Sequence, residues 1–401
     1  MKEQSTVNTL AINGGTPVRT RPFPTWPIFD AQEEKAVVEA VRSEKWGLGG
    51  TKIPEFEEKF AAYQSAKYGI CVANGTVSLI VALKAAGVKY EDEVIVPPYT
   101  FMATASAVLE VGAIPVFVDI DPHTFCLDPN KIEAAITAKT KAIIPVHLGG
   151  HTADMDRIME IAEYRNLLVI EDAAHAHGAE WKGVRVGAIG HMGSFSFQSS
   201  KNLCCGEGGI IVTNHEEYAD KCYSYHNCGR IRGGAKYEHH LLGQNYRMGE
   251  FQGAILLAQF ARFDAQTDRR NENGKYLAAR LLEIGGVIPQ ARDPRVTRHG
   301  FHLFITRYDK ETFWGLDRNT FMKAINAEGI PFTAGYSLLY KEPLFTAQGG
   351  DYLNVSCPVS EAFAGQDLWL NQAVLLGDRQ DMDDILDAVI KVKAHCKELA
   401  G

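Results

Sequence analysis

The stretch Leu167-Leu168-Val169-Ile170-Glu171-Asp172 decides the fold class of this chain. Its four apolar residues in a row are typical of a parallel strand that is buried on both faces. The segment before it, Asp154–Arg165, has apolar residues at helical spacing. A helix that leads into a buried strand predicts a crossover unit of an α/β sheet.

The same alternation of short β-branched runs with helical patterns extends in both directions, from Tyr68 to Thr213. It predicts a large α/β domain around a mostly parallel seven-stranded sheet. The other predicted strands are Tyr68–Ala73, Glu93–Pro97, Ile114–Asp119, Lys141–Val146, Gly193–Phe197 and Gly209–Thr213. The other predicted helices in this region are Thr76–Ala86, Thr104–Val111 and Asn130–Thr137.

The pattern changes after a helical segment at Phe251–Arg269. A strand is then predicted at Phe301–Tyr308, and helices are predicted at Arg318–Glu328 and Asp381–Lys397. We therefore predict a large domain over residues 1–270, which includes an N-terminal segment, and a smaller α+β domain over residues 271–401.

Composition limits the classes of function. The chain has 401 residues, of which 46% are hydrophobic and 22% charged, as in an ordinary globular protein. A net charge of -8 without a basic run argues against a nucleic-acid-binding surface. The eight scattered cysteines form no C-x-x-C pair, which favours reduced thiols in a cytoplasm. Met1–Asn8 do not have the composition of a signal peptide and no apolar run could cross a bilayer, so no membrane partner is expected.

Asp172 closes the apolar strand, where a carboxylate is costly unless it meets a positive partner. The pyridinium nitrogen of pyridoxal phosphate is such a partner, because a buried aspartate keeps it protonated. Two alternatives stay open. Asp172 could cap the next helix, or it could join His175 and His177 in a metal site, which is the weaker competitor.

Two further segments are placed where strands end. Ser194–Lys201 runs from a strand into a polar turn, and a lysine behind strands loses solvation, so its amine can act as a nucleophile and proton carrier. Gly75 and Thr76 lie between a strand and a helix, where backbone N–H groups can bind a phosphate. A solvated surface lysine and an ordinary capped turn are the alternatives.

These segments together resemble the DegT/DnrJ/StrS family of aminotransferases, which act on keto-sugars and related rings. The resemblance spans nearly the whole chain and implies the fold-type-I aminotransferase architecture, pyridoxal phosphate, and a homodimer with shared active sites. The stretches that carry it are Asn74–Thr76, Val94–Phe101, Glu171–Gly178, Ser194–Phe197 with Lys201, Gly206–Gly209 and Gly243–Met248.

By position, the resemblance makes Lys201 the lysine that holds the cofactor as an imine, and Asp172 the partner of its ring nitrogen. Phe101 would stack on the ring face opposite the substrate. His175 replaces the glutamine that many members have near the phenolic oxygen, which resembles the branch with the aminohydroxybenzoate synthases. The phosphate would be bound by Gly75, Thr76 and Ser196, and by Asn245 of the neighbouring subunit.

The resemblance implies that glutamine or glutamate gives its amino group to a cyclic ketone by way of pyridoxamine phosphate. Lys201 favours transamination, because a related dehydratase branch has histidine in its place. Gly335–Tyr340 lacks the histidines of members that act on nucleotide-linked sugars. Asn13–Arg19, Pro24–Pro27 and Pro358–Glu361 look more like glutamine-dependent aminotransferases of cyclitols such as scyllo-inosose.

The candidates for substrate contacts are Trp46 in a glycine-rich loop, Arg247, Tyr336 and Tyr340. Trp46 would belong to a mobile lid, Arg247 would bind the donor carboxylate, and the tyrosines would offer hydroxyls. An interface loop and core aromatic residues are the alternatives. Two rival functions stay open: a dehydratase that aromatises its ring, and a regulatory protein that binds the cofactor without catalysis.

Overall fold

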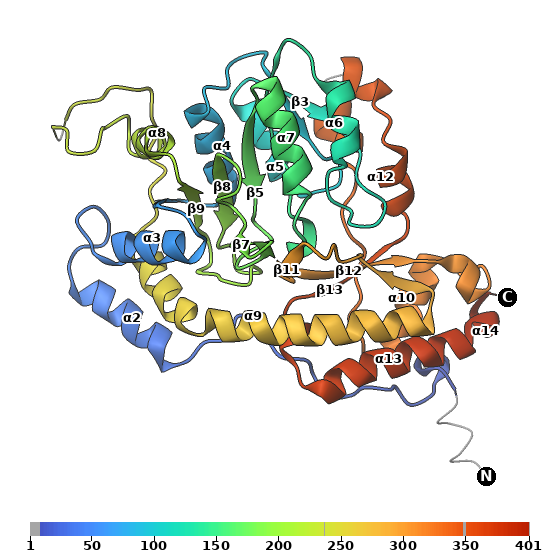
Figure 1. Cartoon of the computed structure of the whole chain (residues 1–401). Coiled ribbons are helices and arrows are strands. Elements are labelled where there is room, and N and C mark those ends of the chain that lie inside the picture. The colour runs from blue at the N-terminus through green and yellow to red at the C-terminus, as the bar shows by residue number, and fades with distance from the viewer. Residues whose placement is uncertain (1–8, 236, 348–349, 401) are drawn as a thin grey trace.

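The computed structural model describes residues 9–235, 237–347 and 350–400, so Met1–Asn8 lie outside the described residues. A seven-stranded sheet with the order β1-β9-β8-β5-β4-β2-β3 forms its centre (Figure 1). The strands are β1 (Tyr68–Val72), β2 (Glu93–Val96), β3 (Ile114–Phe117), β4 (Thr140–Ile143), β5 (Leu168–Asp172), β8 (Met192–Ser196) and β9 (Gly209–Thr213). β9 is antiparallel to both of its neighbours, β1 and β8, and the other strand pairs of this sheet are parallel, which confirms the mostly parallel α/β prediction.

Helices cover both faces of this sheet. One face packs against α4 (Gly75–Ala85), α5 (Ala103–Glu110) and α8 (Glu216–His226). The other packs against α3 (Lys52–Tyr63), α6 (Pro129–Ala135), α7 (Met155–Arg165) and α9 (Glu250–Ile284). Val169 and Ile170 of β5 are both fully buried but belong to core clusters on opposite faces. This explains why the strand is apolar without alternation.

A second, antiparallel sheet has the order β10-β12-β13. Its strands are β10 (Val287–Pro289), β12 (Leu303–Tyr308) and β13 (Asp367–Asn371). Its core includes α10 (Arg318–Ala327) and α13 (Arg379–Ala394), and also Leu10 from the N-terminal segment. A third, small sheet has the order β11-β6-β7 and is formed by β6 (Glu180–Trp181), β7 (Val184–Arg185) and β11 (Val296–Arg298). The other α-helices are α2 (Ala31–Arg42), α11 (Pro343–Thr346), α12 (Pro358–Phe363) and α14 (Cys396–Ala400).

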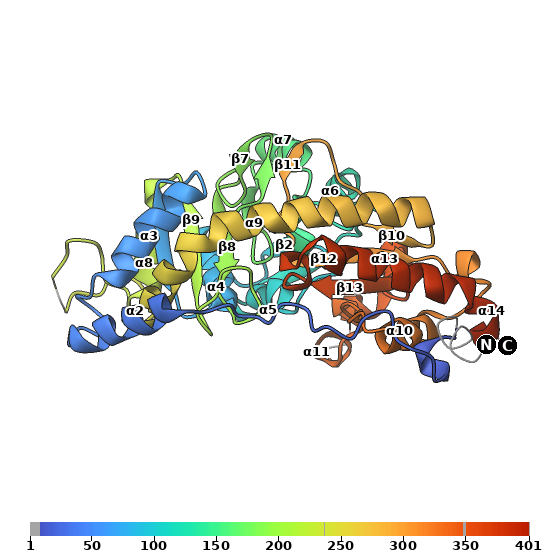
Figure 2. The ribbon, with the colours of Figure 1, turned by 90° about the horizontal axis from the view of Figure 1, so that it is seen from below.

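Helix α9 is longer than the predicted segment Phe251–Arg269 and joins the two sheets. It runs for 35 residues along the molecule, so residue 270 lies inside it (Figure 2). The predicted last helix is instead two helices, α13 and α14, because the chain leaves helical geometry at His395. A division of the chain near residue 270 would therefore cut one continuous helix. It would also separate Leu10 from the core of the second sheet, against which it packs.

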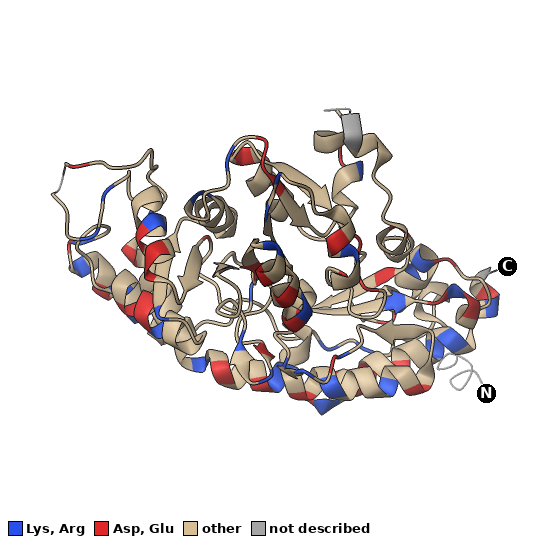
Figure 3. Cartoon of the chain, turned by 45° about the horizontal axis from the view of Figure 1, so that its top comes forward, with Lys and Arg blue, Asp and Glu red and all other residues tan. Residues whose placement is uncertain are grey.

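The surface carries both signs of charge. Lysine and arginine lie beside aspartate and glutamate along the outer helices (Figure 3). In the described part of the chain, no helix combines the length and the apolar character that a membrane span requires.

Candidate active site

A cavity of about 770 Å³, called the main cavity below, lies where the strands of the large sheet end. Its walls come from the last residues of β5 and β8 and from the segments that follow β1, β2, β4, β5 and β8, and two further residues, His302 and Tyr336, come from the part of the chain that carries the second sheet. The predicted site residues that it brings together are Gly75, Thr76, Phe101, Asp172, His175, Ser196, Lys201 and Tyr336.

Asp172 is the last residue of β5 and its carboxylate is buried. The hydroxyl of Thr104 donates a hydrogen bond of 2.7 Å to Oδ2, and the Ala174 N–H donates one of 3.3 Å to Oδ1. Burial raises the pKa of Asp172, while the Thr104 hydrogen bond and the nearby charge of Lys201 act in the opposite direction. A cation in the main cavity would hold this carboxylate ionised.

Glu171, the neighbouring carboxylate, has a different task. It accepts hydrogen bonds from the backbone N–H groups of Gly187, Ile189 and Gly190, at 2.7, 2.8 and 2.6 Å. Its Oε2 also lies 2.9 Å from Nε2 of His147. Glu171 therefore has a full set of internal partners, and we assign it to the structure of the sheet rather than to the cavity.

Lys201 follows β8 in a turn closed by its own N–H, which donates a hydrogen bond of 2.8 Å to the Gln198 carbonyl. Burial lowers the pKa of the amine from 10.5 to about 8, against the opposing charge of Asp172. Among the described residues, Asp172 is the one carboxylate whose charge acts on the pKa of this amine, and it forms no ion pair with it. Near neutral pH an appreciable fraction of this amine is therefore neutral and nucleophilic.

The opposite end of the cavity is built to bind an anion. Asn74 caps α4 by accepting a hydrogen bond of 2.9 Å from the Val77 N–H. The N–H groups of Gly75 and Thr76, in the first turn, have no acceptor inside the helix. A Cβ at Gly75 would lie 2.6 Å from the Cβ of Ser196, so only glycine lets the Ser196 hydroxyl come this close to the helix N-terminus.

His175, Phe101 and Tyr336 form the remaining wall. Nδ1 of His175 accepts a hydrogen bond of 3.3 Å from the Gly149 N–H, and Nε2 lies 3.5 Å from the Tyr336 hydroxyl. Burial holds the pKa of His175 well below 6.5, so its ring is neutral with the proton on Nε2. The Phe101 ring is exposed and lies 6.2 Å from that of Tyr336.

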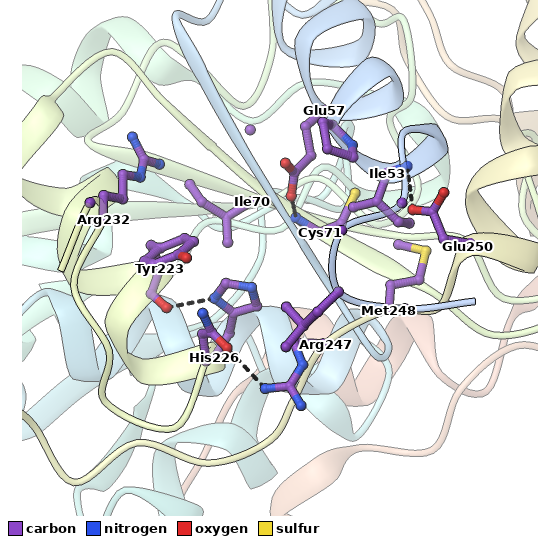
Figure 4. Close-up of a pocket in the computed structure, with 18 residues that line it drawn as sticks. Ile53, Glu57, Ile70, Cys71, Tyr223, His226, Arg232, Arg247, Met248 and Glu250 are labelled. Carbon is purple, nitrogen blue, oxygen red and sulfur yellow. Dashed lines mark hydrogen bonds between the residues drawn. The ribbon is translucent and has the colours of Figure 1, made fainter. Parts of the chain in front are cut away.

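Four predicted residues do not line the main cavity. Arg247 lines a separate pocket of about 350 Å³ beside the loop that follows Trp46, and its guanidinium donates a hydrogen bond of 2.9 Å to Asn227 (Figure 4). The Trp46 indole donates to the Val41 carbonyl at 3.0 Å. Asn245 is exposed. Tyr340 is buried and donates its hydroxyl to Glu361 at 2.6 Å, as the core alternative predicted.

Sequence reasoning missed three residues of this site. Thr104 starts a predicted helix, and nothing in the sequence connects it to Asp172. Asn202 and His302 bond to each other across 100 positions of the chain. The only sequence signal for these residues was that Asn202 directly follows Lys201.

The described residues contain no group of three His, Cys, Asp or Glu side chains that could hold a metal ion, so no metal cluster supports the metal alternative.

The cavity residues fit pyridoxal phosphate. The helix N-terminus with Ser196, which a Cβ at Gly75 would fill, suits the phosphate. The buried carboxylate of Asp172 suits a protonated ring nitrogen. Lys201 would supply an amine for the aldehyde, and the exposed ring of Phe101 would supply an apolar surface for the pyridine.

Comparison with known proteins agrees with this geometry. An L-glutamine:2-deoxy-scyllo-inosose aminotransferase from Streptoalloteichus tenebrarius is 38% identical over 97% of this chain and 99% of its own. The crystal structure of 3-amino-5-hydroxybenzoic acid synthase superposes with a TM-score of 0.86 at 35% identity, over 92% of this chain and 99% of the other.

A Bacillus subtilis protein solved with its bound cofactor PMP is 29% identical, with a TM-score of 0.80, over 91% of this chain and 82% of the other. The profile of the DegT/DnrJ/EryC1/StrS aminotransferases matches residues 27–390. Family profile, relatives and cavity agree: the chain belongs to the DegT/DnrJ/EryC1/StrS aminotransferase family.

Proposed function

We propose that this aminotransferase moves an amino group from glutamine, or from glutamate, to the ketone carbon of a cyclitol of the inosose class or of a keto-sugar. The observation that carries the proposal is that Lys201 and Asp172 line one cavity with an anion-binding end. The substrate class comes from the relative that is named for glutamine and 2-deoxy-scyllo-inosose. The Gly335–Tyr340 segment, without the histidines of nucleotide-sugar members, favours the cyclitol.

The cofactor of this enzyme is pyridoxal phosphate. We assign its phosphate to Gly75, Thr76 and Ser196, and its ring nitrogen to Asp172. Phe101 would cover one face of the ring, and His175 would lie on the side of the phenolic oxygen. When bound, the cofactor supplies an electron sink that stabilises negative charge on the substrate carbon.

Lys201 moves the proton. With its pKa lowered to about 8, the free amine can take the proton from the Cα of the donor amino acid. In the half of the reaction that uses the acceptor, the same side chain in its protonated form can deliver a proton to the ring carbon that receives the amino group. Burial of the surrounding wall, which includes His175 and Asp172, keeps bulk water from competing for that proton.

The donor carboxylate requires a positive partner. Among the described residues that line the main cavity, Lys201 is the only basic group that is charged to a large extent at neutral pH, because burial keeps His175 and His302 neutral, and Lys201 is already committed to the cofactor and the proton. We propose that the enzyme is a homodimer in which the second copy brings Arg247 and Asn245 to the cavity. Arg247 would bind the carboxylate with its planar fork, and Asn245 would bind the phosphate. Trp46 would then belong to the same interface or to a lid over it.

An apolar surface supports this second copy. A groove of about 620 Å³ runs between α2 and the segment after Ser199, and Phe29 and Val38 line it with exposed side chains. Exposed apolar surface of this kind marks an interaction site. The groove lies beside the turn that holds Lys201, so a subunit seated on it would be close to the main cavity.

We propose a reducing, cytoplasmic setting, which is supported by the eight cysteines, all of them free. We also propose a division into a large cofactor-binding part up to residue 270 and a smaller part from residue 271. The supporting observation is that each of the two sheets has its own core cluster, although α9 is continuous across the division.

The test is a reaction of the holoenzyme with glutamine or glutamate and scyllo-inosose. The proposal expects one aminated cyclitol for each keto acid released, together with a reversible change in the absorption of the bound cofactor when the donor is added.

The second candidate is the ring-aromatising reaction, which is favoured by His175 and by the likeness to 3-amino-5-hydroxybenzoic acid synthase. Loss of water with formation of an aromatic product would replace the first proposal with the second.

A further inference from the structure

His302 lines the main cavity, although it lies on the second part of the chain, directly before β12. The side chain is buried, and its ring centre lies 4.4 Å from that of His175. The activity described above gives His302 no task. A buried polar group on the wall of a cavity calls for a partner.

The hydrogen bonds around Asn202 fix the tautomer of His302. The amide nitrogen of Asn202 donates a hydrogen bond of 2.7 Å to the Gly300 carbonyl, which can only accept. The amide oxygen of Asn202 must therefore be the end that lies 3.3 Å from Nδ1 of His302. That oxygen can only accept, so Nδ1 carries the proton.

The ring of His302 is also neutral. Burial holds its pKa well below 6.5, and the charge of Lys201 acts in the same direction, followed by His175, His177 and the buried guanidinium of Arg270. Nε2 of a neutral ring with a proton on Nδ1 has a free lone pair. No hydrogen-bond partner for this nitrogen occurs among the described residues, so it is available to a ligand in the cavity.

The two neighbouring imidazoles thus have opposite polarity. Nε2 of His175 is a donor, because its Nδ1 accepts from Gly149, whereas Nε2 of His302 is an acceptor. An acceptor repels carboxylates and carbonyl oxygens and selects groups with an O–H or N–H. On a polyhydroxylated ring, that group is a hydroxyl.

We propose that His302 is a specificity-determining residue whose Nε2 accepts a hydrogen bond from one hydroxyl of the cyclic acceptor, with Asn202 as the residue that positions it. This inference rests on the proposed function, because it takes a hydroxylated cyclic ketone as the substrate. It predicts that His302 acts on the ring-aminating half of the reaction and not on the half that uses the amino donor.

The test compares scyllo-inosose with its monodeoxy analogues in the wild-type holoenzyme and in H302L and H302Q. One lost neutral hydrogen bond reduces kcat/KM by about tenfold. In the wild type, we expect one deoxy analogue to have a kcat/KM about tenfold below that of scyllo-inosose. In H302L, kcat/KM for scyllo-inosose should fall by the same factor, so that the two substrates have equal values. H302Q has an amide oxygen near the position of Nε2 and should recover part of the preference for scyllo-inosose.

The donor half-reaction is the internal control. Single-turnover absorption changes with glutamine should stay within about twofold of wild type in H302L. N202A, which frees the ring to take either tautomer, should raise KM for scyllo-inosose and leave kcat nearly unchanged. Because N202A keeps the imidazole, it also tests the proposal if H302L does not fold.

Three results would overturn the inference. The first is an equal loss in the donor half-reaction, which would assign His302 to the chemistry of Lys201. The second is a set of kcat/KM values for the deoxy analogues, relative to scyllo-inosose, that is the same in wild type, H302L and N202A. The third is a wild type that aminates no hydroxylated cyclic ketone at all, which would remove the proposed function and, with it, this inference.

Discussion

The hydroxyl of Thr104 on α5 donates a hydrogen bond of 2.7 Å to Oδ2 of Asp172 at the end of β5. This contact joins two crossover units of the sheet, and it stabilises the ionised form of a carboxylate that burial would otherwise neutralise. In the proposed site, a cofactor nitrogen that must stay protonated would depend on that ionised form. The contact would therefore matter for the proposed function, although it is not visible in either segment alone.

Replacing Thr104 by valine should raise the pKa of Asp172, because the charged form loses a hydrogen bond while its burial remains. Asp172 would then become protonated at a higher pH, so the acid limb of the pH profile of kcat/KM should move to higher pH. A hydrogen bond to a charged group contributes about 1.5–3 kcal/mol, so activity at the acid end should fall by about tenfold or more. The pH profile of T104V measures this, and T104S, which keeps the hydroxyl, should restore it. Equal profiles for T104V and wild type would contradict the assignment.

Lys201 should react with aldehydes at an unusually low pH. Its neutral amine is the reactive form, and with a pKa of about 8 in place of 10.5 about one amine in ten is neutral at pH 7. In apoenzyme, the rate of cofactor attachment should therefore rise with pH and level off above about 8. D172N should move the midpoint lower, because the charge of Asp172 raises the pKa of Lys201. K201A should trap no cofactor with borohydride and should keep the wild-type melting temperature. Trapping in K201A would identify a different lysine.

Sequence patterns located the strand ends, and patterns together with the family resemblance assigned the residues on them. Asp172, Lys201, Gly75 and Ser196 follow apolar strands, and parallel strands bring their ends to one edge of a sheet. Thr104 and His302 could not be found in this way, because their partners lie 68 and 100 positions away. The site is therefore predictable where it depends on strand order and not where it depends on side-chain partners.

The length of α9 was missed for a similar reason. Its polar stretch at Asp268–Asn273 looks like the end of a helix, but Arg270 is fully buried and donates two hydrogen bonds to Gln372. Asn273 donates to the carbonyls of Leu375 and Gly377. These partners lie about a hundred positions further along the chain, so a local pattern does not reveal that the polar residues face inward.

Gly75 and Ser196 should contribute to the binding of the cofactor's phosphate group and not to the binding of its pyridine ring. G75A would place a methyl group 2.6 Å from the Cβ of Ser196 and should weaken cofactor binding by at least tenfold. S196A removes one hydroxyl and should weaken binding by about tenfold. Titration of apoenzyme with pyridoxal phosphate measures both losses. Titration with pyridoxal, which has no phosphate, should show little difference between S196A and wild type. An equal loss with pyridoxal would argue against a phosphate at this end of the cavity.

Substitution of Glu171 should lower the stability of the fold, whereas substitution of Asp172 should mainly change the bound cofactor. E171Q would set an amide N–H₂ against backbone donors in a buried place, and the free energy of unfolding should fall by about 3 kcal/mol. D172N should lower it by clearly less, because burial already disfavours the charged form of Asp172 and its partner Thr104 is a hydroxyl that can donate or accept. Urea unfolding of the two apoenzymes measures the contrast, and absorption spectra should show that D172N binds a cofactor with altered protonation. Equal losses of stability would place both carboxylates in the same structural role.

Sharing of the active site between subunits can be tested by mixing two inactive variants. N245A damages the residue proposed to cross the interface, whereas K201A damages the cavity itself. A heterodimer of the two would have one site with both residues intact. Random exchange gives heterodimers for about half of the dimers, each with one of its two sites active, so about one quarter of wild-type activity should return. The matched control mixes K201A with D172A, whose residues line the cavity of the same chain, and it should recover nothing. If mixtures of N245A and K201A that demonstrably contain heterodimers stay inactive, each site is complete within one subunit, and the donor carboxylate must be bound by a cation other than Arg247.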